Sequence, residues 1–155
     1  MSEARRVLHF DRLDQVINDA NALADAERAG KLRQLGNWTL GQTCGHLAAW
    51  VDYGYDGIPM KIPWFVRILA RSMKNSVLNK PMKPGRNIPG VNAGTLAVDL
   101  LPTEVGVDRL RRACARLEVG PPATRHPLYG SLTAEEWKKL KLRHAELHLS
   151  FLRAE

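Results

Sequence analysis

The longest irregular stretch of the chain, residues 57–102, most constrains how the protein can fold. It holds six of the nine prolines and several glycines, which interrupt any long helix or strand. We expect one amphipathic helix to survive in it, over about 63–77, with Pro63 in its first turn. The apolar side would carry Phe65, Ile68, Leu69 and Met73, and the basic side Arg67, Arg71 and Lys74. A connection this long in a small domain usually serves as a crossover, a lid or both.

Helical periodicity dominates on both sides of this stretch. Apolar residues recur at helical spacing over about 10–28, 39–56, 103–118 and 133–153, and no run shows the sustained alternation of a strand. Two of these helices begin with a capping box, formed by Thr39 with Gln42 and by Thr133 with Glu136. The pattern predicts an all-α protein, a four-helix bundle with a long crossover between helices two and three and a short extra helix inside it. A chain of 155 residues is most simply one domain, spanning 1–155.

The composition is that of a globular protein, with 45% hydrophobic and 25% charged residues. The first residues hold no apolar stretch long enough for a signal peptide. The most apolar run, residues 62–70, is short and carries Arg67, so we expect no membrane span. Cys44 and Cys114 are too few for a disulfide framework. We therefore expect a cytoplasmic location with reduced thiols.

The net charge of +7 comes from one segment. Between Asp56 and Asp99 there is no acidic residue, whereas acids and bases balance elsewhere. The basic residues of this segment are Lys61, Arg67, Arg71, Lys74, Lys80, Lys83 and Arg86. Such a segment could attract nucleic acid, anionic lipid or an acidic ligand, although a solvated basic face is the commoner interpretation. Since no recognition helix or aromatic-interleaved basic stripe is visible, nucleic acid is not the expected partner.

Two histidines near the end of the chain, His144 and His148, are one helical turn apart and could share one metal ion. About 0.15 such pairs are expected by chance, so a buried structural pair or a surface pair is the alternative interpretation. A third histidine, His46, lies about 10 Å into the second helix, while His148 and His144 lie about 8 and 14 Å from the end of the last. The three histidines lie at the same depth along the bundle if the crossover makes the second and the last helix antiparallel. Glu146 lies on the other side of its helix, which excludes the H-E-x-x-H site of zincins.

Three neutral imidazoles leave a divalent ion with an open position, the pattern of catalytic rather than structural sites. Such an ion can lower the pKa of a bound water or hold a thiol as thiolate, and imidazole suits Zn, Ni, Cu or Fe. No acidic residue near His46 shares its helix face. Tyr53, seven residues beyond His46, is the better polar neighbour, either as part of the site or as a core tyrosine. Cys44 lies about 200° round the helix from His46 and should face away, and Cys114 is expected in the core.

Two segments resemble the DinB/YfiT-like superfamily of metalloenzymes, and most closely its uncharacterised domain-of-unknown-function branch. The first is NWTLGQTCGHLAAWVDYGYDGIP (37–59), similar to that branch's helix W-[ST]-x-G-x-x-x-x-H-L. The second is HPLYGSLTAEEWKKLKLRHAELHL (126–149), similar to its ending H-P-x-[FY]-G-x-L-[ST]-x-E-E-W…H-x-x-x-H. The resemblance implies a four-helix bundle with helices two and four antiparallel, and a Zn or Ni ion on His46, His144 and His148. It also implies thiol transfer, thiol-dependent isomerisation or hydrolysis-like metal chemistry, and is compatible with a homodimer.

Two features depart from the family pattern. Many relatives carry a glutamine about one turn beyond the position of His148, where this chain has Phe151 and Leu152. The proline-rich crossover is also more elaborate than in the thiol-transferring members. His126 is expected to cap its own loop, with a fourth metal-ligand role as the alternative.

The leading hypothesis is a metal-dependent enzyme, in which an ion on the three histidines activates a thiol or water against a small-molecule substrate. The sequence assigns no catalytic residue beyond these ligands. The residues predicted to line the substrate pocket are Trp50, Tyr53, Trp64, His126 and Tyr129. The alternative is a non-catalytic bundle or interaction module that uses the basic segment 61–86 to bind nucleic acid or an anionic surface.

Overall fold

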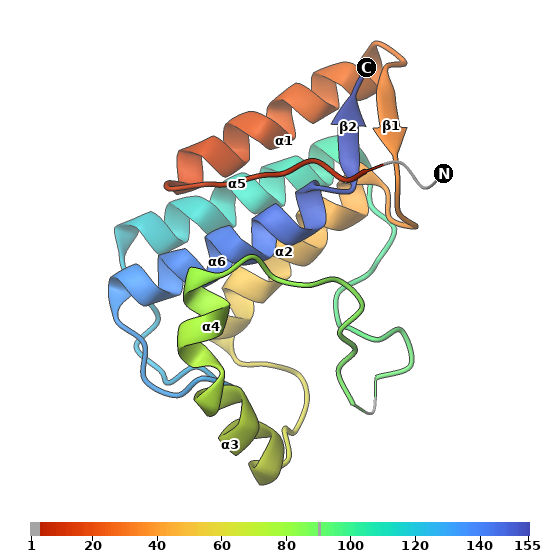
Figure 1. The fold of residues 1–155 in the computed structure, drawn as a ribbon. Coiled ribbons are helices and arrows are strands. Elements are labelled where there is room, and N and C mark those ends of the chain that lie inside the picture. Colours follow the sequence, from red (N-terminus) through yellow and green to blue (C-terminus); the bar gives the residue numbers. More distant parts are fainter. Residues whose placement is uncertain (1–3, 90) are drawn as a thin grey trace.

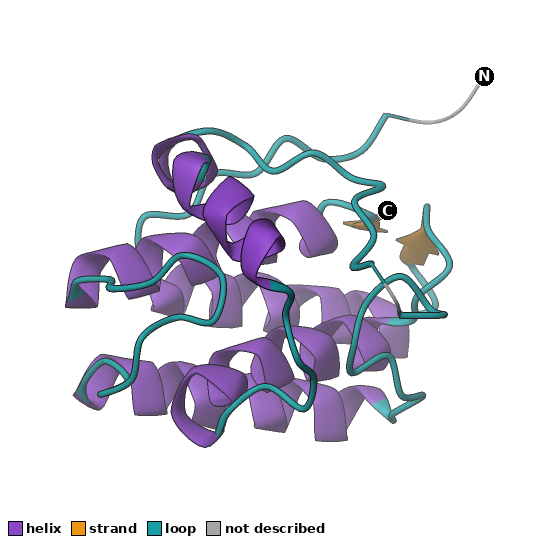
Figure 2. Ribbon diagram, turned by 90° about the horizontal axis from the view of Figure 1, so that it is seen from below, coloured by secondary structure: helices purple, strands orange, loops and turns teal. Residues whose placement is uncertain are grey.

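The computed structural model describes residues 4–89 and 91–155, and this part of the chain is mostly helical (Figure 1, Figure 2). The longest helices are α1 (Leu13–Arg28), α2 (Leu40–Asp56), α5 (Thr103–Val119) and α6 (Ala134–Leu149). The connection between α2 and α5 contains α3 (Trp64–Ser72) and α4 (Lys74–Asn79). Strands β1 (Leu32–Gln34) and β2 (Leu152–Ala154) form a small sheet. The prediction of a mainly helical protein is confirmed, whereas the four-helix bundle topology stays a prediction.

Both predicted capping boxes are present. The Thr39 hydroxyl accepts from the backbone N–H of Gln42 at 3.2 Å, and the Gln42 side chain accepts from the N–H of Thr39 at 3.0 Å. At the start of α6, Thr133 and Glu136 exchange the same two bonds at 3.1 and 2.9 Å. Because each box fixes the first turn of its helix, the helical period determines which later side chains share a face.

Close contacts at two glycines show how α2 lies against its neighbours. A Cβ on Gly106, near the start of α5, would lie 2.3 Å from the carbonyl oxygen of Gly41, near the start of α2. At the other end of α2, a Cβ on Gly54 would lie 2.9 Å from the ring of Trp137, near the start of α6. The helix α5 therefore runs alongside α2 in the same direction, and α6 runs in the opposite one, as Figure 1 also shows.

The apolar core lies between the four longest helices, and most of its side chains are fully buried. Examples from the four helices are Val16, Leu23, Leu47, Val51, Leu110, Leu117 and Leu149. A second, smaller cluster joins α4 to α6 through Val77, Leu78 and Leu140. This second cluster attaches the long connection to α6 and so holds it beside the histidines described below.

The predicted start of the first helix and the predicted end of the last helix are each wrong by several residues. The first helix begins at Leu13 rather than Phe10, whose backbone N–H donates to Glu146 at 2.6 Å and so joins a tertiary contact. The last helix ends at Leu149 instead of Arg153, and the chain continues as β2. The strands pair in antiparallel register, with Leu32 opposite Ala154 and Gln34 opposite Leu152. Strands of three residues are too short to show an alternating pattern.

The single helix predicted over 63–77 is two helices, which meet at Met73. The break turns α4 so that Val77 and Leu78 pack on α6, while Phe65 and Leu69 on α3 remain 59% and 63% exposed. In a continuous helix Val77 would extend the apolar stripe of Leu69 and Met73, since the three are spaced four residues apart, so the pattern alone could not reveal the break. Within residues 4–89 and 91–155, no helix is long and apolar enough to cross a membrane.

Candidate metal centre

His46 lies on the buried side of α2 and is 1% exposed. Its Nδ1 donates a hydrogen bond to the backbone carbonyl oxygen of Leu96, in the last part of the long connection, at 2.9 Å. This partner assigns the proton to Nδ1 and leaves a lone pair on Nε2. Burial lowers the pKa of His46 to about 4, so the ring is neutral at pH 7. A neutral imidazole held by a carbonyl behind it is the arrangement of metal-ligating histidines.

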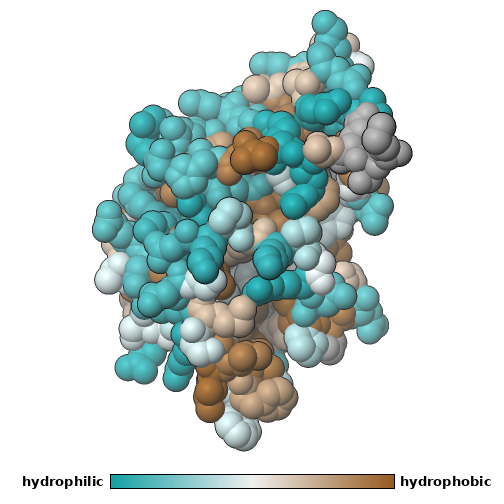
Figure 3. All heavy atoms as spheres, viewed as in Figure 1, coloured by the Kyte–Doolittle hydropathy of each residue, from teal (hydrophilic) through white to brown (hydrophobic). Residues whose placement is uncertain are grey.

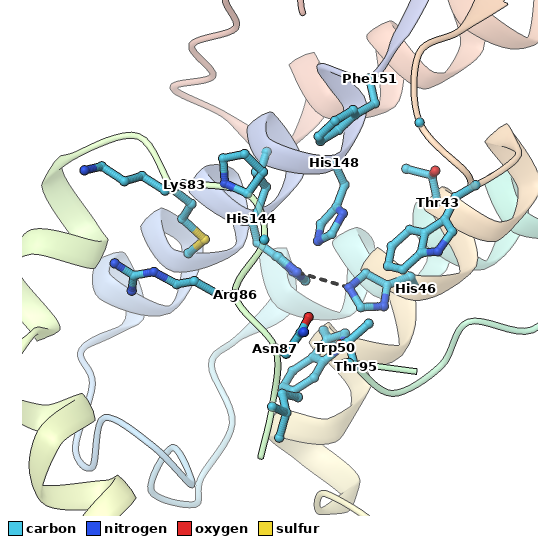
Figure 4. A pocket seen from close by; sticks show the side chains of 18 of the residues that line it. Thr43, His46, Trp50, Lys83, Arg86, Asn87, Thr95, His144, His148 and Phe151 are labelled. Atoms are coloured by element: carbon cyan, nitrogen blue, oxygen red, sulfur yellow. Dashed lines mark hydrogen bonds between the residues drawn. The ribbon is translucent and has the colours of Figure 1, made fainter. Parts of the chain in front are cut away.

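His144 and His148 extend from α6 toward His46 (Figure 4). The Nε2 atoms of His46 and His144 are 3.2 Å apart, and one nitrogen of each ring lies within 4.8 Å of the other two. Burial lowers the pKa of His148 to about 3 and that of His144 well below its ordinary value, and neighbouring histidines add to both shifts. The structure thus brings together the three histidines that helical depth predicted, all in the neutral form that binds metals.

The donor set fits a small divalent ion. In a tetrahedral site with metal–nitrogen bonds of about 2.0–2.1 Å, two ligand nitrogens lie roughly 3.3 Å apart. The 3.2 Å between the Nε2 atoms of His46 and His144 agrees with that spacing. Glu146 takes no part, because its carboxylate accepts from the backbone N–H of Phe10 and pairs with Arg143. Three histidines, with no fourth ligand in the cluster among the described residues, leave an open position, as in catalytic sites.

Two tryptophans restrict the histidine rings. Trp38 stacks on His148 with the ring centroids 5.0 Å apart and the planes 13° from parallel, and its ring lies 4.8 Å from that of His46. Trp50, one turn beyond His46 in α2, lies 6.0 Å from His46 and 6.1 Å from His144. Packed rings of this kind limit the rotamers available to the histidines. Trp38 was not predicted as a pocket residue, although it is the tryptophan of the W-[ST] motif and that motif could have drawn attention to it.

A cavity of about 550 Å³ opens beside the three histidines. Residues of α2 and α6 form one wall, and residues 82–88 and 93–95 of the long connection form the other (Figure 4). Three of the predicted pocket residues line it, namely Trp50, His126 and Tyr129. Tyr53 does not, because it lies two turns beyond His46 and packs its ring against Trp50 at 5.5 Å. Trp64 does not either, because it is 69% exposed on α3.

A buried lysine in the cavity wall was not predicted. Lys141 lies one turn before His144 on α6 and is 7% exposed. Its Nζ donates to the backbone carbonyl oxygen of Trp50 at 2.6 Å. Burial lowers the pKa of Lys141 to about 7. The sequence did contain a signal for this residue. Lys141 lies three residues before His144 and therefore on the same inward face of α6, where a lysine is unusual because lysines are rarely buried.

His126 makes the hydrogen bonds of a loop residue. Its Nδ1 accepts from the backbone N–H groups of Leu128 and Tyr129 at 3.1 and 3.2 Å, and its main chain pairs with that of Gly130. The ring lies 5.1 Å from that of Trp137 and 4.9 Å from that of Tyr129. These contacts shape the loop before α6, and they correspond to the capping role expected for this residue.

Neither cysteine belongs to the site. Cys44 and Cys114 are buried in the apolar core between the helices, as their helical positions predicted. Burial raises the pKa of each thiol to about 12, so both remain protonated and unreactive at neutral pH.

The fold and the site define a helical protein with a cluster of three histidines that can bind a metal ion. Residues 2–155 match the family described as "Protein of unknown function (DUF1569)", and the chain belongs to that family. Neither curated proteins nor solved structures show a significant match. The predicted membership of an uncharacterised family is therefore confirmed, while the wider relation to DinB-like proteins stays a prediction.

Proposed function

We propose that this protein is a metal-dependent enzyme of the DinB-like superfamily, with a Zn or Ni ion on His46, His144 and His148. One observation carries the proposal: neutral imidazole nitrogens from two helices converge within 4.8 Å, beside a cavity. The scaffold of the proposal is a four-helix bundle formed by one domain over residues 1–155. A cytoplasmic location and a homodimer remain predictions that belong to the same proposal.

The chemistry of the site divides between the ion and the chain. A divalent ion supplies Lewis acidity, which lowers the pKa of a thiol or of water. The Leu96 carbonyl keeps the His46 ring turned toward the other two histidines, and the wall formed by residues 82–88 and 93–95 limits access of bulk water. Together they provide a preorganised, partly enclosed place for a small substrate.

The lining of the cavity favours a thiol over water as the nucleophile. Among the described residues that line it, none is an aspartate or glutamate, so no carboxylate stands ready as a general base. A thiol ionises near pH 8.5, about seven units below water, and therefore needs far less help to lose its proton. We expect thiol transfer or a thiol-dependent reaction of a small electrophile, with hydrolysis as the alternative within the same class.

Metal content tests the ligand set. Protein purified without a polyhistidine tag should contain close to one ion per chain by inductively coupled plasma mass spectrometry, after exposure to Zn or Ni. His46→Ala and His144→Ala should each lose it, because two imidazoles hold an ion much more weakly than three. His9→Ala is the matched control, since the His9 side chain is 65% exposed and does not line the cavity. Unchanged metal content in both site variants would refute the proposed ligands.

Turnover tests the reaction. The metal-loaded protein would be incubated with small electrophiles and a panel of low-molecular-weight thiols, and the loss of free thiol would be followed against His144→Ala. Metal- and thiol-dependent turnover supports the proposal. Turnover that needs only water would make the protein a hydrolase, and a metal site without turnover on either panel would leave a non-catalytic bundle.

The exposed face of α3 favours a second function, which is binding to an anionic membrane surface. Its apolar side chains are 59–69% exposed and gather at one end of the molecule (Figure 3), where Figure 1 places α3. They are Trp64, Phe65, Ile68 and Leu69. Arg67 and Arg71 share this short helix, within the segment that lacks acidic residues. A basic helix with an aromatic and aliphatic face is typical of proteins that bind at the lipid interface.

Vesicle co-sedimentation tests this second function. We expect binding to vesicles that contain phosphatidylglycerol, weaker binding at higher salt, and little binding to phosphatidylcholine alone. The double variant F65S/L69S should lose binding. Leu100→Ser is the matched control, because Leu100 is 76% exposed but lies outside α3. Binding unaffected by F65S/L69S would exclude the helix, and binding to duplex DNA in place of vesicles would favour the nucleic-acid alternative.

A further inference from the structure

The buried ammonium group of Lys141 has no ionic partner in the part of the chain that the structure describes. Its side chain is 7% exposed, and none of the carboxylates in residues 4–89 and 91–155 pairs with it. The ammonium has three N–H donors, of which one is used by the Trp50 carbonyl oxygen at 2.6 Å. It also lies 5.6 Å above the ring of Trp137. A charge taken out of water without a counterion is costly, so an anionic ligand that pairs with Lys141 would stabilise its charged form.

The other cations of the cavity are at its rim. Lys83 and Arg86 line the cavity from the long connection, but both are exposed, and Figure 4 shows their charged ends directed away from the histidines. Water and salt screen charges in such positions, so they attract an anion without fixing it. Lys141 is thus the one buried cation in the described lining, and no described acidic residue lines the cavity.

We propose that the cavity binds a small organic monocarboxylate, whose carboxylate pairs with Lys141 and whose apolar part lies against Leu128 and Leu140. Both apolar residues line the same cavity as Lys141. The proposal names the substrate class of the proposed enzyme and rests on it for the reaction, but carboxylate binding itself does not depend on the metal.

The charge of the site selects a carboxylate among anions. In the metal-free cavity one buried ammonium balances one negative charge, whereas a phosphate dianion would leave an uncompensated charge there. Phosphate sites also gather several donors, such as guanidinium groups or a helix N-terminus, and the described lining places no buried arginine there. A neutral ligand would offer the Lys141 ammonium no negative charge to pair with.

The experiment compares hexanoate with hexanamide, which has the same chain but no charge. Binding is measured by calorimetry and by the fluorescence of Trp38 and Trp50, which line the cavity. Chelator-treated and metal-loaded proteins are both used. We expect hexanoate to bind both forms and Lys141→Met to weaken it by at least about tenfold, because a charge-assisted hydrogen bond is lost. Lys83→Met, the same substitution at the exposed rim, should weaken it by less than about threefold.

Four outcomes separate this proposal from the metal proposal. Hexanoate affinity unchanged in K141M would overturn the carboxylate site, as would no binding to either form. Binding found only in the metal-loaded protein, lost in His144→Ala and retained in K141M, would mean that the ion holds the carboxylate, which overturns the role of Lys141 and leaves the metal site intact. Binding that depends on Lys141 in a protein that takes up no metal would support the carboxylate site and refute the metal proposal.

A structural role for Lys141 is tested in the same set. A lysine that only ties α6 to the Trp50 carbonyl would change the melting temperature when replaced but would not distinguish hexanoate from hexanamide. If K141M proves too unstable to assay, the proposal is tested with the wild-type protein alone. It must then bind hexanoate at least about tenfold more tightly than hexanamide, and equal affinities overturn the proposal.

Discussion

His46 and His126 are both neutral imidazoles, but they carry the ring proton on different nitrogen atoms. In His46, Nδ1 donates to the Leu96 carbonyl oxygen, so Nε2 keeps a lone pair that an ion can use. In His126, Nδ1 accepts from the backbone N–H groups of Leu128 and Tyr129, so a neutral ring carries its proton on Nε2. His126 therefore has no lone pair left for a metal ion, although it lines the same cavity. Backbone partners, and not proximity alone, separate the ligand from the loop residue.

His126 should make the protein sensitive to acid. Burial lowers the pKa of His126 to about 3, and the nearby Lys141 adds to the shift. An unfolded histidine titrates near pH 6.5, so this stability is fully present above pH 6.5 and is lost as the pH falls toward 3. The loss is about 1.4 kcal/mol for each pH unit below 6.5. His126→Asn keeps an acceptor for the loop and does not titrate.

Urea denaturation of the metal-free proteins at pH 7.5 and 5.5 measures this effect. We expect the wild type to lose about 1 kcal/mol more stability between these pH values than H126N does. His46, His144 and His148 titrate in both proteins, so their contributions cancel. Equal losses would mean that the buried ring of His126 does not determine acid stability.

At the scale of elements, the pairing of α2 with α5 depends on glycine. A Cβ on Gly106 would lie 2.3 Å from the carbonyl oxygen of Gly41, closer than backbone atoms can accept. We therefore expect Gly106→Ala to destabilise the protein by about 2 kcal/mol or more, although alanine is the better helix former. At Gly120, beyond the end of α5, nothing lies within 4 Å of an added Cβ, and Gly120→Ala should stay within about 0.5 kcal/mol of wild type. Chemical denaturation of both variants checks this, and equal effects would contradict the close approach.

Local signals predicted the helices well and their tertiary details poorly. The capping boxes at Thr39 and Thr133 were visible because each depends on residues three apart. The pairing of β1 with β2 joins Leu32 to Ala154 across the whole chain, and neither strand is long enough to show its period. The break at Met73 depends on α6, against which α4 packs, and such a partner is not visible in the sequence of the segment itself.

The candidate site divides in the same way. The three histidines were predictable because helical rise gave their depth and one assumption about direction placed them level. Trp38, Leu96 and Lys141 were not predicted, because each contributes through a contact with a distant element: a ring on α6, a ring on α2 and a carbonyl on α2. The position of a residue along its own helix could be predicted from the sequence, whereas the residues that it contacts on other elements could not.

For the molecule as a whole, the long connection couples the site to folding. It supplies the Leu96 carbonyl behind His46 and one wall of the cavity, and α4 attaches it to α6 through Val77 and Leu78. The proposed ligands themselves come from α2 and from α6, which are 98 residues apart at His46 and His144. Such a site exists only when the helices and the connection have docked, so an ion should bind the folded chain far better than the unfolded one.

Metal binding should therefore raise the melting temperature. An ion present at 100 times its dissociation constant stabilises the folded state by about 2.7 kcal/mol. At about 2–4 °C per kcal/mol for a protein of this size, the melting temperature should rise by roughly 5–10 °C and return to its starting value on chelation. His9→Ala should show the full rise and His144→Ala none, as measured by calorimetry with and without the ion. A rise retained in His144→Ala would place the stabilising ion elsewhere, because a site that has lost the nitrogen 3.2 Å from His46 cannot keep its affinity.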